Sequence, residues 1–450
     1  MAQVQVKFTT TEEQYAVPSS APILLPTDFK RSALNEVINH LLGKGRENAV
    51  NFEFLIDDTL LRTSLASYLT QHNLSAENVL SIQYIVAVPP PKPVASFQAD
   101  DWISAVGISS AERFVSGGYD GVVRLWNREG ETCAKLQLGT APLKSVALLP
   151  PTNPGAEALE GIVRVAAAGM NQKTAIVELS DDGTAKHVCD LTGHTGTIES
   201  IVVAPNSEHL YSAAWDASIQ VYSVSETSLG TASLPPPTKK PRKGMGSAAA
   251  AAASSTQASG PAVPQLSPVG SLTGHVGAVN GVSASERELF SGGNDHSIRQ
   301  WDLRTHTLMA SMSCEKVVRG VSYSARNGLV ASAHADPVVR VWDPRSTDAT
   351  LVKARLLGHR NQVAAVAWAP DAEHHLASAS LDGSVRVFDL RSPSQALHIV
   401  QQPVALPNAT VEEGKKAPIA KRFCVGWSHG MVVSGGEDCT LGVWEAPSTH

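Results

Sequence analysis

Four side chains near the middle of the chain could act together in catalysis or metal binding: His275, Ser291, Asp295 and Trp301. A histidine close to a carboxylate is common in both kinds of site. Part of this set, however, recurs along the chain. A small residue or Ser is followed after four positions by Asp or Asn, and after six more by an aromatic or aliphatic residue. The seven copies are Ser116/Asp120/Trp126, Ala167/Asn171/Val177, Ser212/Asp216/Tyr222, Ser291/Asp295/Trp301, Ser332/Asp336/Trp342, Ser378/Asp382/Phe388 and Ser434/Asp438/Trp444.

This repetition indicates a structural role for the four residues. A single active site does not need seven copies of its side chains, whereas a repeated element of a fold does. We therefore expect His275, Ser291, Asp295 and Trp301 to form a buried chain of hydrogen bonds, which we call the clip. Such a network stabilises a fold when every member has a partner. Only the fourth copy has all four members, because the others lack the Gly-His pair or the Trp.

The spacing of the copies predicts the elements that position the clip. Successive Asp or Asn residues lie 51, 45, 79, 41, 46 and 56 positions apart. A period in the forties is typical of the four-stranded blades of a β-propeller. In the fourth copy, residues 288–291 and 297–302 read as strands around a turn whose Gly and Asn residues suit a tight hairpin. The chain is thus expected to be mostly β, with a seven-bladed propeller over residues 99–450.

The end of the last repeat predicts how the ring closes. Only six residues follow Trp444, which is too few for a turn and an outer strand. We expect residues 93–97 to supply that strand, so that residues 89–98 form a Pro-rich joint followed by a ring-closing strand. Closure of this kind removes an exposed sheet edge.

Residues 1–88 lack the repeat and predict a separate domain. Alternating or apolar runs at 4–8, 14–25, 52–56 and 79–86 read as strands. Helical spacing of apolar residues over 34–42 indicates a helix with Ser32 as its N-cap, and 60–74 contains a shorter one. Two strands, a helix, a strand, a short helix and a strand make a small α+β, ubiquitin-like (β-grasp) domain. It ends in three prolines, which form a stiff joint.

Residues 223–268, between the third and fourth blades, show no strand pattern and predict a disordered insertion. The segment contains a run of alanines and a basic cluster of Lys239, Lys240, Arg242 and Lys243. Such a cluster is typical of a nuclear localisation signal or an RNA-contacting patch. A loop that is merely kept soluble by its charges is the alternative.

Composition narrows the function further. The 450 residues are enough for two domains with cores, and 43% of them are apolar. A net charge of −6 with a pI near 6.2 argues against nucleic acid as the main ligand. Five cysteines without a C-x-x-C pair favour reduced thiols. With no apolar signal core at the N-terminus and no long apolar run, we expect a soluble protein of the cytosol or nucleus.

A ubiquitin-like domain followed by a seven-bladed propeller is an uncommon combination. The chain resembles the eukaryotic ribosome-assembly factors of the Notchless class, and more closely the WD-repeat subunit of the PeBoW complex. The resemblance covers nearly the whole chain outside the insertion. Its most specific stretches are residues 34–42, 54–56 with 60–65, and 74–77.

The resemblance implies a non-enzymatic scaffold for maturation of the large (60S) ribosomal subunit and its rRNA. The propeller would bind the block-of-proliferation protein, which also binds pescadillo. The ubiquitin-like domain would dock on the metal-ion-dependent adhesion site of the AAA ATPase midasin, whose movement would pull the factor off the pre-ribosome. The implied location is the nucleus, nucleolus and nucleoplasm. RNA contact is left open, and neither a membrane nor a small-molecule substrate is expected.

The resemblance also places one site residue. The acid that completes the coordination of a Mg²⁺ or Mn²⁺ ion held by midasin maps onto Glu77. A hard divalent cation with an open position accepts a carboxylate oxygen. No cofactor of the chain's own is implied. Without the resemblance, Glu77 would be read as an exposed acid in a turn.

Two other classes of function compete with this interpretation. Blade ends of the type Trp-Asp-x-Arg, at 301–304 and 342–345 with a Phe variant at 388–391, are found in substrate receptors of cullin-type ubiquitin ligases. Ion pairs on the propeller rim would explain the same arginines. An enzyme is disfavoured because no phosphate loop, H-E-x-x-H or G-x-S-x-G elbow stands in a suitable context. The face that binds a partner stays open, with candidate anchors at Trp215, Arg319, Lys421, Arg422 and Trp427.

Overall fold

The computed structural model describes residues 2–446 except 19–20, 46–47, 58, 76–77, 151–160, 206–207, 225–262, 347–351, 402–403 and 405–417. Contacts divide the chain into two compact units. One is built from Met1–Val94, Ser324–Ser434 and Gly442–His450, and the other from Ala95–Tyr323 and Gly435–Leu441. In the described part of the chain, no helix is long and apolar enough to cross a membrane.

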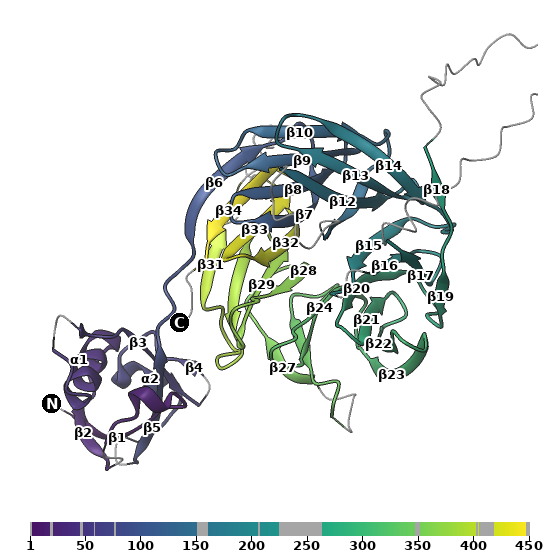
Figure 1. The fold of residues 1–450 in the computed structure, drawn as a ribbon. Helices are drawn as coiled ribbons and strands as arrows, with labels where there is room; N and C mark the ends of the chain where they lie inside the picture. The colour runs from purple at the N-terminus through teal and green to yellow at the C-terminus, as the bar shows by residue number, and fades with distance from the viewer. Residues whose placement is uncertain are drawn as a thin grey trace, which may run out of the picture. The chain divides into compact units, whose positions relative to one another are not determined.

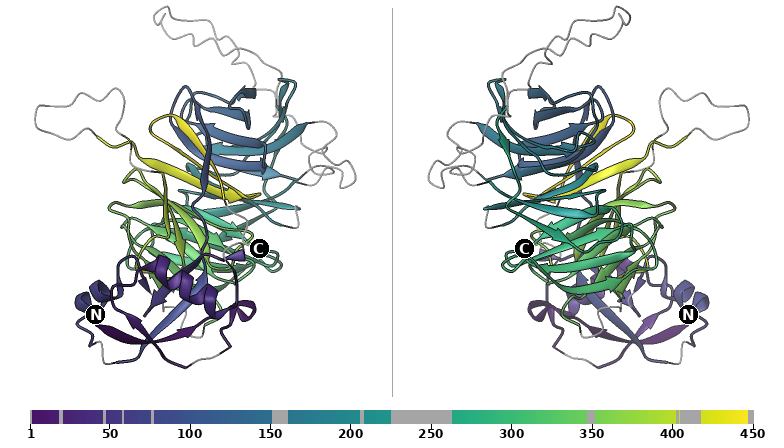
Figure 2. Two further views of the ribbon diagram at one scale, coloured as in Figure 1. Left: turned by 90° about the vertical axis from the view of Figure 1, so that its left-hand side faces the viewer. Right: turned by 90° about the vertical axis from the view of Figure 1, so that its right-hand side faces the viewer.

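The N-terminal domain is a five-stranded sheet with two helices (Figure 1). Its strand order is β2-β1-β5-β3-β4, and β1 runs parallel to β5. The strands are β1 (Gln3–Thr9), β2 (Ile23–Pro26), β3 (Phe52–Ile56), β4 (Thr59–Leu60) and β5 (Leu80–Val86). The helices are α1 (Arg31–Leu41) and α2 (Leu65–Gln71), and a 3-10 turn spans Glu13–Tyr15. Figure 2 shows the helices from two further sides.

One core joins the helices to this sheet. Leu34 and Ile38 of α1 and Leu65 of α2 are fully buried, in one cluster with residues such as Val6 and Phe52 of the strands. Alternation of buried and exposed residues along β1 explains why only one face of that strand enters the core. The sheet order and helices are those of a ubiquitin-like, β-grasp domain.

Two local expectations for this domain are wrong. The second strand is confined to Ile23–Pro26 rather than filling residues 14–25, whose first part forms the 3-10 turn. Helix α1 begins at Arg31, with Lys30 and not Ser32 in the N-cap position. Arg31 is fixed by an ion pair of 2.8 Å to Glu53 and a hydrogen bond of 3.2 Å to the carbonyl of Phe52. These contacts with β3 hold the first turn in place without a side-chain cap.

Seven further sheets make up a β-propeller. Six of them contain four strands, and the second gains a fifth strand. The strands of the first three are β7 (Ile103–Ser110), β8 (Arg113–Gly118), β9 (Val122–Asn127), β10 (Thr132–Gln137), β11 (Leu143–Leu149), β12 (Ile162–Gly169), β13 (Thr174–Ser180), β14 (Ala185–Leu191), β18 (Gln265–Leu266), β15 (Ile198–Val203), β16 (His209–Ala214), β17 (Ser218–Ser223) and β19 (Gly270–Thr273).

The next three sheets follow in simple chain order. They consist of β20 (Val279–Ala284), β21 (Glu288–Gly293), β22 (Ser297–Asp302), β23 (Thr307–Ser313), β24 (Val318–Tyr323), β25 (Val330–His334), β26 (Val339–Trp342), β27 (Val352–Leu356), β28 (Val363–Trp368), β29 (His375–Ser380), β30 (Val385–Asp389) and β31 (His398–Gln401). The last sheet has the order β32-β33-β34-β6, from β32 (Arg422–Ser428), β33 (Met431–Gly436), β34 (Thr440–Glu445) and β6 (Lys92–Gln98). Its outer strand therefore precedes the first blade in the sequence.

The ends of the insertion differ from the expectation. Ser223 is the last residue of β17, and Gln265–Leu266 form β18, so the range 223–268 is not free of strands. β18 pairs in parallel with β14 of the second sheet, and the amide of Thr192 donates to the carbonyl of Leu266 at 2.9 Å. This pairing was not predictable from two residues of sequence. The middle of the insertion, with its basic cluster, lies outside the described residues.

A bulge recurs at the start of the first strand of five sheets. At each place one residue on the first strand has no counterpart on the second, so the extra side chain is re-aimed. The extra residue is the second residue of its strand in all five cases: Ser104, Lys144, Glu199, Asn280 and Ala364.

Candidate interaction sites

The structure brings the four clip residues of the fourth sheet into one chain of hydrogen bonds. His275 Nδ1 lies 2.7 Å from Asp295 Oδ2, and His275 Nε2 lies 2.8 Å from Ser291 Oγ. The indole N–H of Trp301 donates to the same hydroxyl at 2.8 Å. Burial lowers the pKa of His275, although Asp295 acts in the opposite direction. Each ring nitrogen has a partner within this blade, so the arrangement supports a structural role.

Other sheets build the same clip with different members. In the third, His194 contacts Asp216 at 2.8 Å and Ser212 Oγ at 2.7 Å. In the sixth, His359 makes the equivalent contacts with Asp382 and Ser378, while Phe388 packs without a donor. The first sheet replaces the histidine with Arg124, which lies 2.5 Å from Asp120 Oδ2.

One clip residue escaped the sequence analysis. The fifth repeat lacks a Gly-His pair, but His334 lies two residues after Ser332 and places Nε2 2.7 Å from its hydroxyl. Trp342 donates to the same oxygen at 2.7 Å, and Arg340 binds Asp336 through two nitrogens. The sequence offered one signal for this role, the histidine two positions after the repeat serine Ser332. No other copy of the repeat has a histidine at this position.

We expect the clip of the third sheet to make the free energy of unfolding depend on pH in the acidic range. Burial alone would raise the pKa of Asp216, but hydrogen bonds from Ser218, His194 and the amide of Thr195 lower it to about 2, from 3.8. The unfolded chain therefore binds the proton more tightly. The stabilisation is complete above about pH 4 and is lost as the pH falls towards 2.

Asp216→Asn tests this coupling. The difference in unfolding free energy between the wild type and this variant should shrink by about 1 kcal/mol between pH 5 and pH 3. Urea unfolding at both pH values measures it. A difference that is the same at both would show that Asp216 titrates alike in the folded and unfolded chain.

The rim arginines are engaged by their own motifs. Arg345 contacts Asp343 through Nε at 2.9 Å and Nη2 at 3.0 Å, and Arg391 binds Asp389 in the same forked manner. Such forked pairs fix both groups. They agree with rim ion pairs at 342–345 and at the Phe variant 388–391, whereas at 301–304 Asp302 accepts a hydrogen bond from the backbone amide of Arg304.

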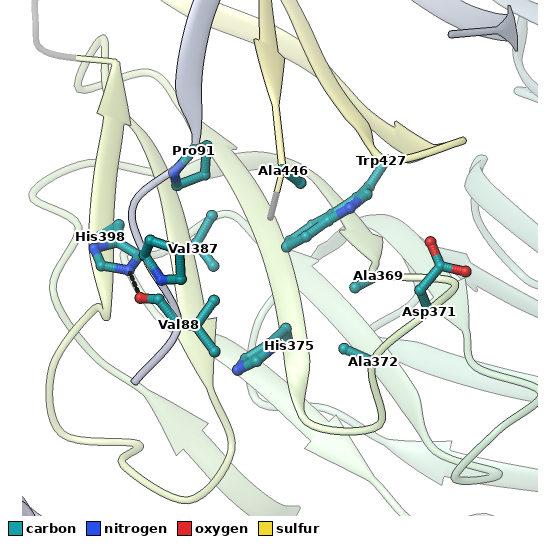
Figure 3. Close-up of a pocket in the computed structure, with 12 residues that line it drawn as sticks. Val88, Pro91, Ala369, Asp371, Ala372, His375, Val387, His398, Trp427 and Ala446 are labelled. Atoms are coloured by element: carbon teal, nitrogen blue, oxygen red, sulfur yellow. Dashed lines mark hydrogen bonds between the residues drawn. The ribbon is translucent and has the colours of Figure 1, made fainter. Parts of the chain in front are cut away.

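A small pocket lies where the Pro-rich joint meets the sixth sheet (Figure 3). Val88, the last residue of the N-terminal domain, and Pro91 of the joint face His375, Val387 and Trp427, which belong to the sheets. His398 Nε2 lies 2.9 Å from the carbonyl oxygen of Val88. The lining is mostly apolar, and residues of the joint form one wall of the pocket. We therefore describe this pocket as the packing site of the joint on the propeller, and call it the seat of the joint.

Further contacts hold the N-terminal domain beside the sixth sheet. Leu55, Leu60 and Ile85 form a buried cluster with Leu397, and Arg62 Nη2 donates to the carbonyl of Leu397 at 3.1 Å. The hydrophobic contact and the two hydrogen bonds between side chains and backbone carbonyls all involve the same short segment, residues 397–398. The N-terminal domain thus contacts the sixth sheet directly as well as through the joint.

The candidate anchors separate into different classes. Trp215 is 53% exposed, and Arg319 and Lys421 are also exposed. Arg422, one of the candidate anchors, is 1% exposed and is the first residue of β32, so it offers almost no surface to a partner. Trp427 lines the seat of the joint.

The structure does not describe Glu77, the acid predicted to contact midasin. Glu77 lies outside the described residues, between α2 and β5, as do Lys239, Lys240, Arg242 and Lys243. Within the described ranges, no three His, Cys, Asp or Glu side chains gather as a metal site.

Two family models match the chain. The NLE (NUC135) domain matches residues 4–69. The WD domain, G-beta repeat, matches residues 91–127, 180–223, 266–302, 305–343 and 351–389. These five ranges contain the first, third, fourth, fifth and sixth copies of the repeat. The second copy, with its degenerate clip, and the seventh lie outside the matched ranges.

Similar proteins match over almost the full length. The ribosome biogenesis protein YTM1 of Meyerozyma guilliermondii is 31% identical over 98% of this chain and 95% of its own. The ribosome biogenesis protein WDR12 homolog of Chlamydomonas reinhardtii is 32% identical over 99% of this chain and 98% of its own. The WDR12 homolog of Nematostella vectensis is 29% identical and covers 98% of both chains. The agreement includes both the N-terminal domain and the propeller.

Proposed function

This chain belongs to the family of ribosome biogenesis proteins that includes YTM1 and WDR12, and from that membership we propose that it is a non-enzymatic scaffold for maturation of the large (60S) ribosomal subunit. The observation that carries the proposal is the pairing of an NLE-type ubiquitin-like domain with a WD-repeat propeller in one chain. The His and Asp residues that could suggest catalysis are used by the clips.

In this proposal the two domains hold different partners. The propeller binds the block-of-proliferation protein in a complex with pescadillo on the pre-ribosome. The ubiquitin-like domain docks on midasin, and the chain works in the nucleus, nucleolus and nucleoplasm. A scaffold of this kind needs two binding surfaces that are covalently joined, because linkage raises the effective concentration of one partner near the other.

Glu77 is proposed as the midasin contact. Its carboxylate would fill the open position of a Mg²⁺ or Mn²⁺ ion held by midasin, as hard cations accept carboxylate oxygens. The residue follows α2 and precedes β5 in the sequence, and both of these elements contribute side chains to the buried core of the domain.

Glu77→Ala should abolish co-purification of midasin and leave the block-of-proliferation protein and pescadillo bound. The measurement is affinity purification of the tagged full-length chain, with Glu36→Ala as a control because Glu36 is an exposed acid on α1 of the same domain. Removal of residues 1–88 should give the same loss. Midasin retained by Glu77→Ala would exclude Glu77 as the contact, whereas absence of all assembly proteins from the wild type would refute the scaffold itself.

A further inference from the structure

Five side chains of the propeller form one connected group, which we name the Trp215 cluster. Lys144, Glu199 and Arg319 lie at the starts of β11, β15 and β24, and Tyr119 and Trp215 directly follow β8 and β16. Lys144 Nζ lies 3.0 Å from the hydroxyl of Tyr119 and 4.9 Å from the centre of its ring. Glu199 accepts a hydrogen bond from the Trp215 side chain and has Lys144 and Arg319 as cationic neighbours. All five belong to the unit built from Ala95–Tyr323 and Gly435–Leu441.

The recurring bulge places the charged members of this cluster. Lys144 and Glu199 are the extra residues at the bulges of β11 and β15, and Arg319 is the second residue of β24, the same position in its strand. Other side chains at this position reach a neighbouring sheet. Ser104 Oγ donates to the carbonyl of Leu143 at 2.6 Å, and Asn280 Nδ2 donates to that of Val318 at 2.6 Å.

Trp215 is held in place while much of its ring stays exposed. Its amide donates to the carbonyl of Thr197 at 2.9 Å, and its side chain is hydrogen-bonded to Glu199. Even so, 53% of the residue is exposed, so local packing accounts for only part of its surface. Trp102, which is 38% exposed, extends the aromatic surface, because its ring packs edge-on against that of Tyr119 with 5.4 Å between the ring centroids. Ordered Trp, Tyr and Arg side chains of this kind dominate binding energy in protein interfaces.

The charges of the cluster favour an acidic ligand. The cluster contains two cations, Lys144 and Arg319, and one carboxylate, Glu199, which is hydrogen-bonded to Trp215. An excess of positive charge beside an indole ring complements an acidic side chain next to an apolar one. Single-stranded RNA also stacks on aromatic rings near cations. The chain's net charge of −6 opposes the broad basic field that RNA binding requires.

We propose that the Trp215 cluster is a docking surface for a protein segment that carries an acidic side chain next to an apolar one. The inference deepens the proposed scaffold function, on which it rests for the expectation that a protein partner exists. The apolar side chain of the segment packs on Trp215, and the acidic side chain pairs with Arg319 and Lys144.

An array of random ten-residue peptides, probed with the purified full-length chain, tests the docking surface directly. Bound peptides should be enriched in Asp or Glu adjacent to Leu, Ile or Phe. Trp215→Ala should weaken binding of the best peptides by about tenfold or more, as expected for an aromatic anchor. Met309→Ala is the matched control, because Met309 is 55% exposed on the outer strand β23 and should change nothing. Thermal unfolding of each variant verifies its fold.

A charge reversal completes the test. Arg319→Glu should remove the preference for acidic peptides while the apolar preference remains. Peptides that bind without acidic enrichment, or equally well to Trp215→Ala, would overturn the proposal. Oligouridine binding that depends on Trp215 would overturn it in favour of RNA. Because the array contains no ribosomal component, these outcomes are separate from failure of the purified wild type to capture assembly proteins.

Discussion

Replacing Trp301 by alanine is expected to lower the free energy of unfolding by about 3–5 kcal/mol. The side chain is 1% exposed and lies in one core cluster with Leu289 and Val279. Its loss leaves a cavity between strands. It also removes the indole donor to Ser291, although that hydroxyl keeps His275 as a partner. Denaturant unfolding followed by circular dichroism measures the change.

A conservative variant separates packing from hydrogen bonding at this position. Trp301→Phe keeps an aromatic ring but has no N–H donor, as in the sixth sheet, where Phe388 occupies the equivalent position. It should therefore be clearly less destabilising than Trp301→Ala, with the lost hydrogen bond contributing about 1 kcal/mol. Equal effects of the two variants would show that the bond, and not the packed ring, stabilises the blade.

Removal of strand β6 is expected to destabilise the propeller far more than removal of the N-terminal domain alone. β6 is the fourth strand of the last sheet. Phe97 within it is 4% exposed, and its ring stacks on Trp126 at 5.8 Å and lies 6.2 Å from that of Phe114. Loss of this aromatic side chain alone costs about 3–5 kcal/mol. Exposure of a sheet edge adds a tendency to aggregate.

Two truncations make the comparison. A chain that begins at residue 89 retains β6, whereas one that begins at residue 99 lacks it. Thermal unfolding should show a midpoint at least several degrees lower for the shorter chain, consistent with a loss of a few kcal/mol. Coincident unfolding curves for the two truncations would contradict a structural role for β6 in the last sheet.

The fold class could be read from the sequence because its determinants are local and repeated. Ser291 and Trp301 lie on the two strands of one hairpin and Asp295 lies in its turn, so their spacing along the chain brings them together in space. The expected outer strand of the last sheet, residues 93–97, lies within β6 (Lys92–Gln98), which is next to β34 in that sheet. Apolar periodicity likewise located α1, although not its first residue.

What escaped prediction depends on partners distant in the sequence. His334 could not be assigned to a clip before its strand was known to carry it towards Ser332. Arg422 was a candidate anchor, although the folded chain leaves it 1% exposed. The Trp215 cluster combines residues as far apart as Tyr119 and Arg319, and no local pattern links them.

The short strand β18 has a mechanical consequence. Residues that follow the insertion first pair with β14 of the second sheet and only then form β19 of the third. A pulling force that reaches β18 from the insertion would therefore act on the β14–β18 pairing before it acted on β19. That pairing includes hydrogen bonds of 2.8 Å and 2.9 Å on either side of Leu191. On this side of the insertion the pairing with the second sheet would have to open before force reached β19, whereas the other side continues directly from β17 of the third sheet.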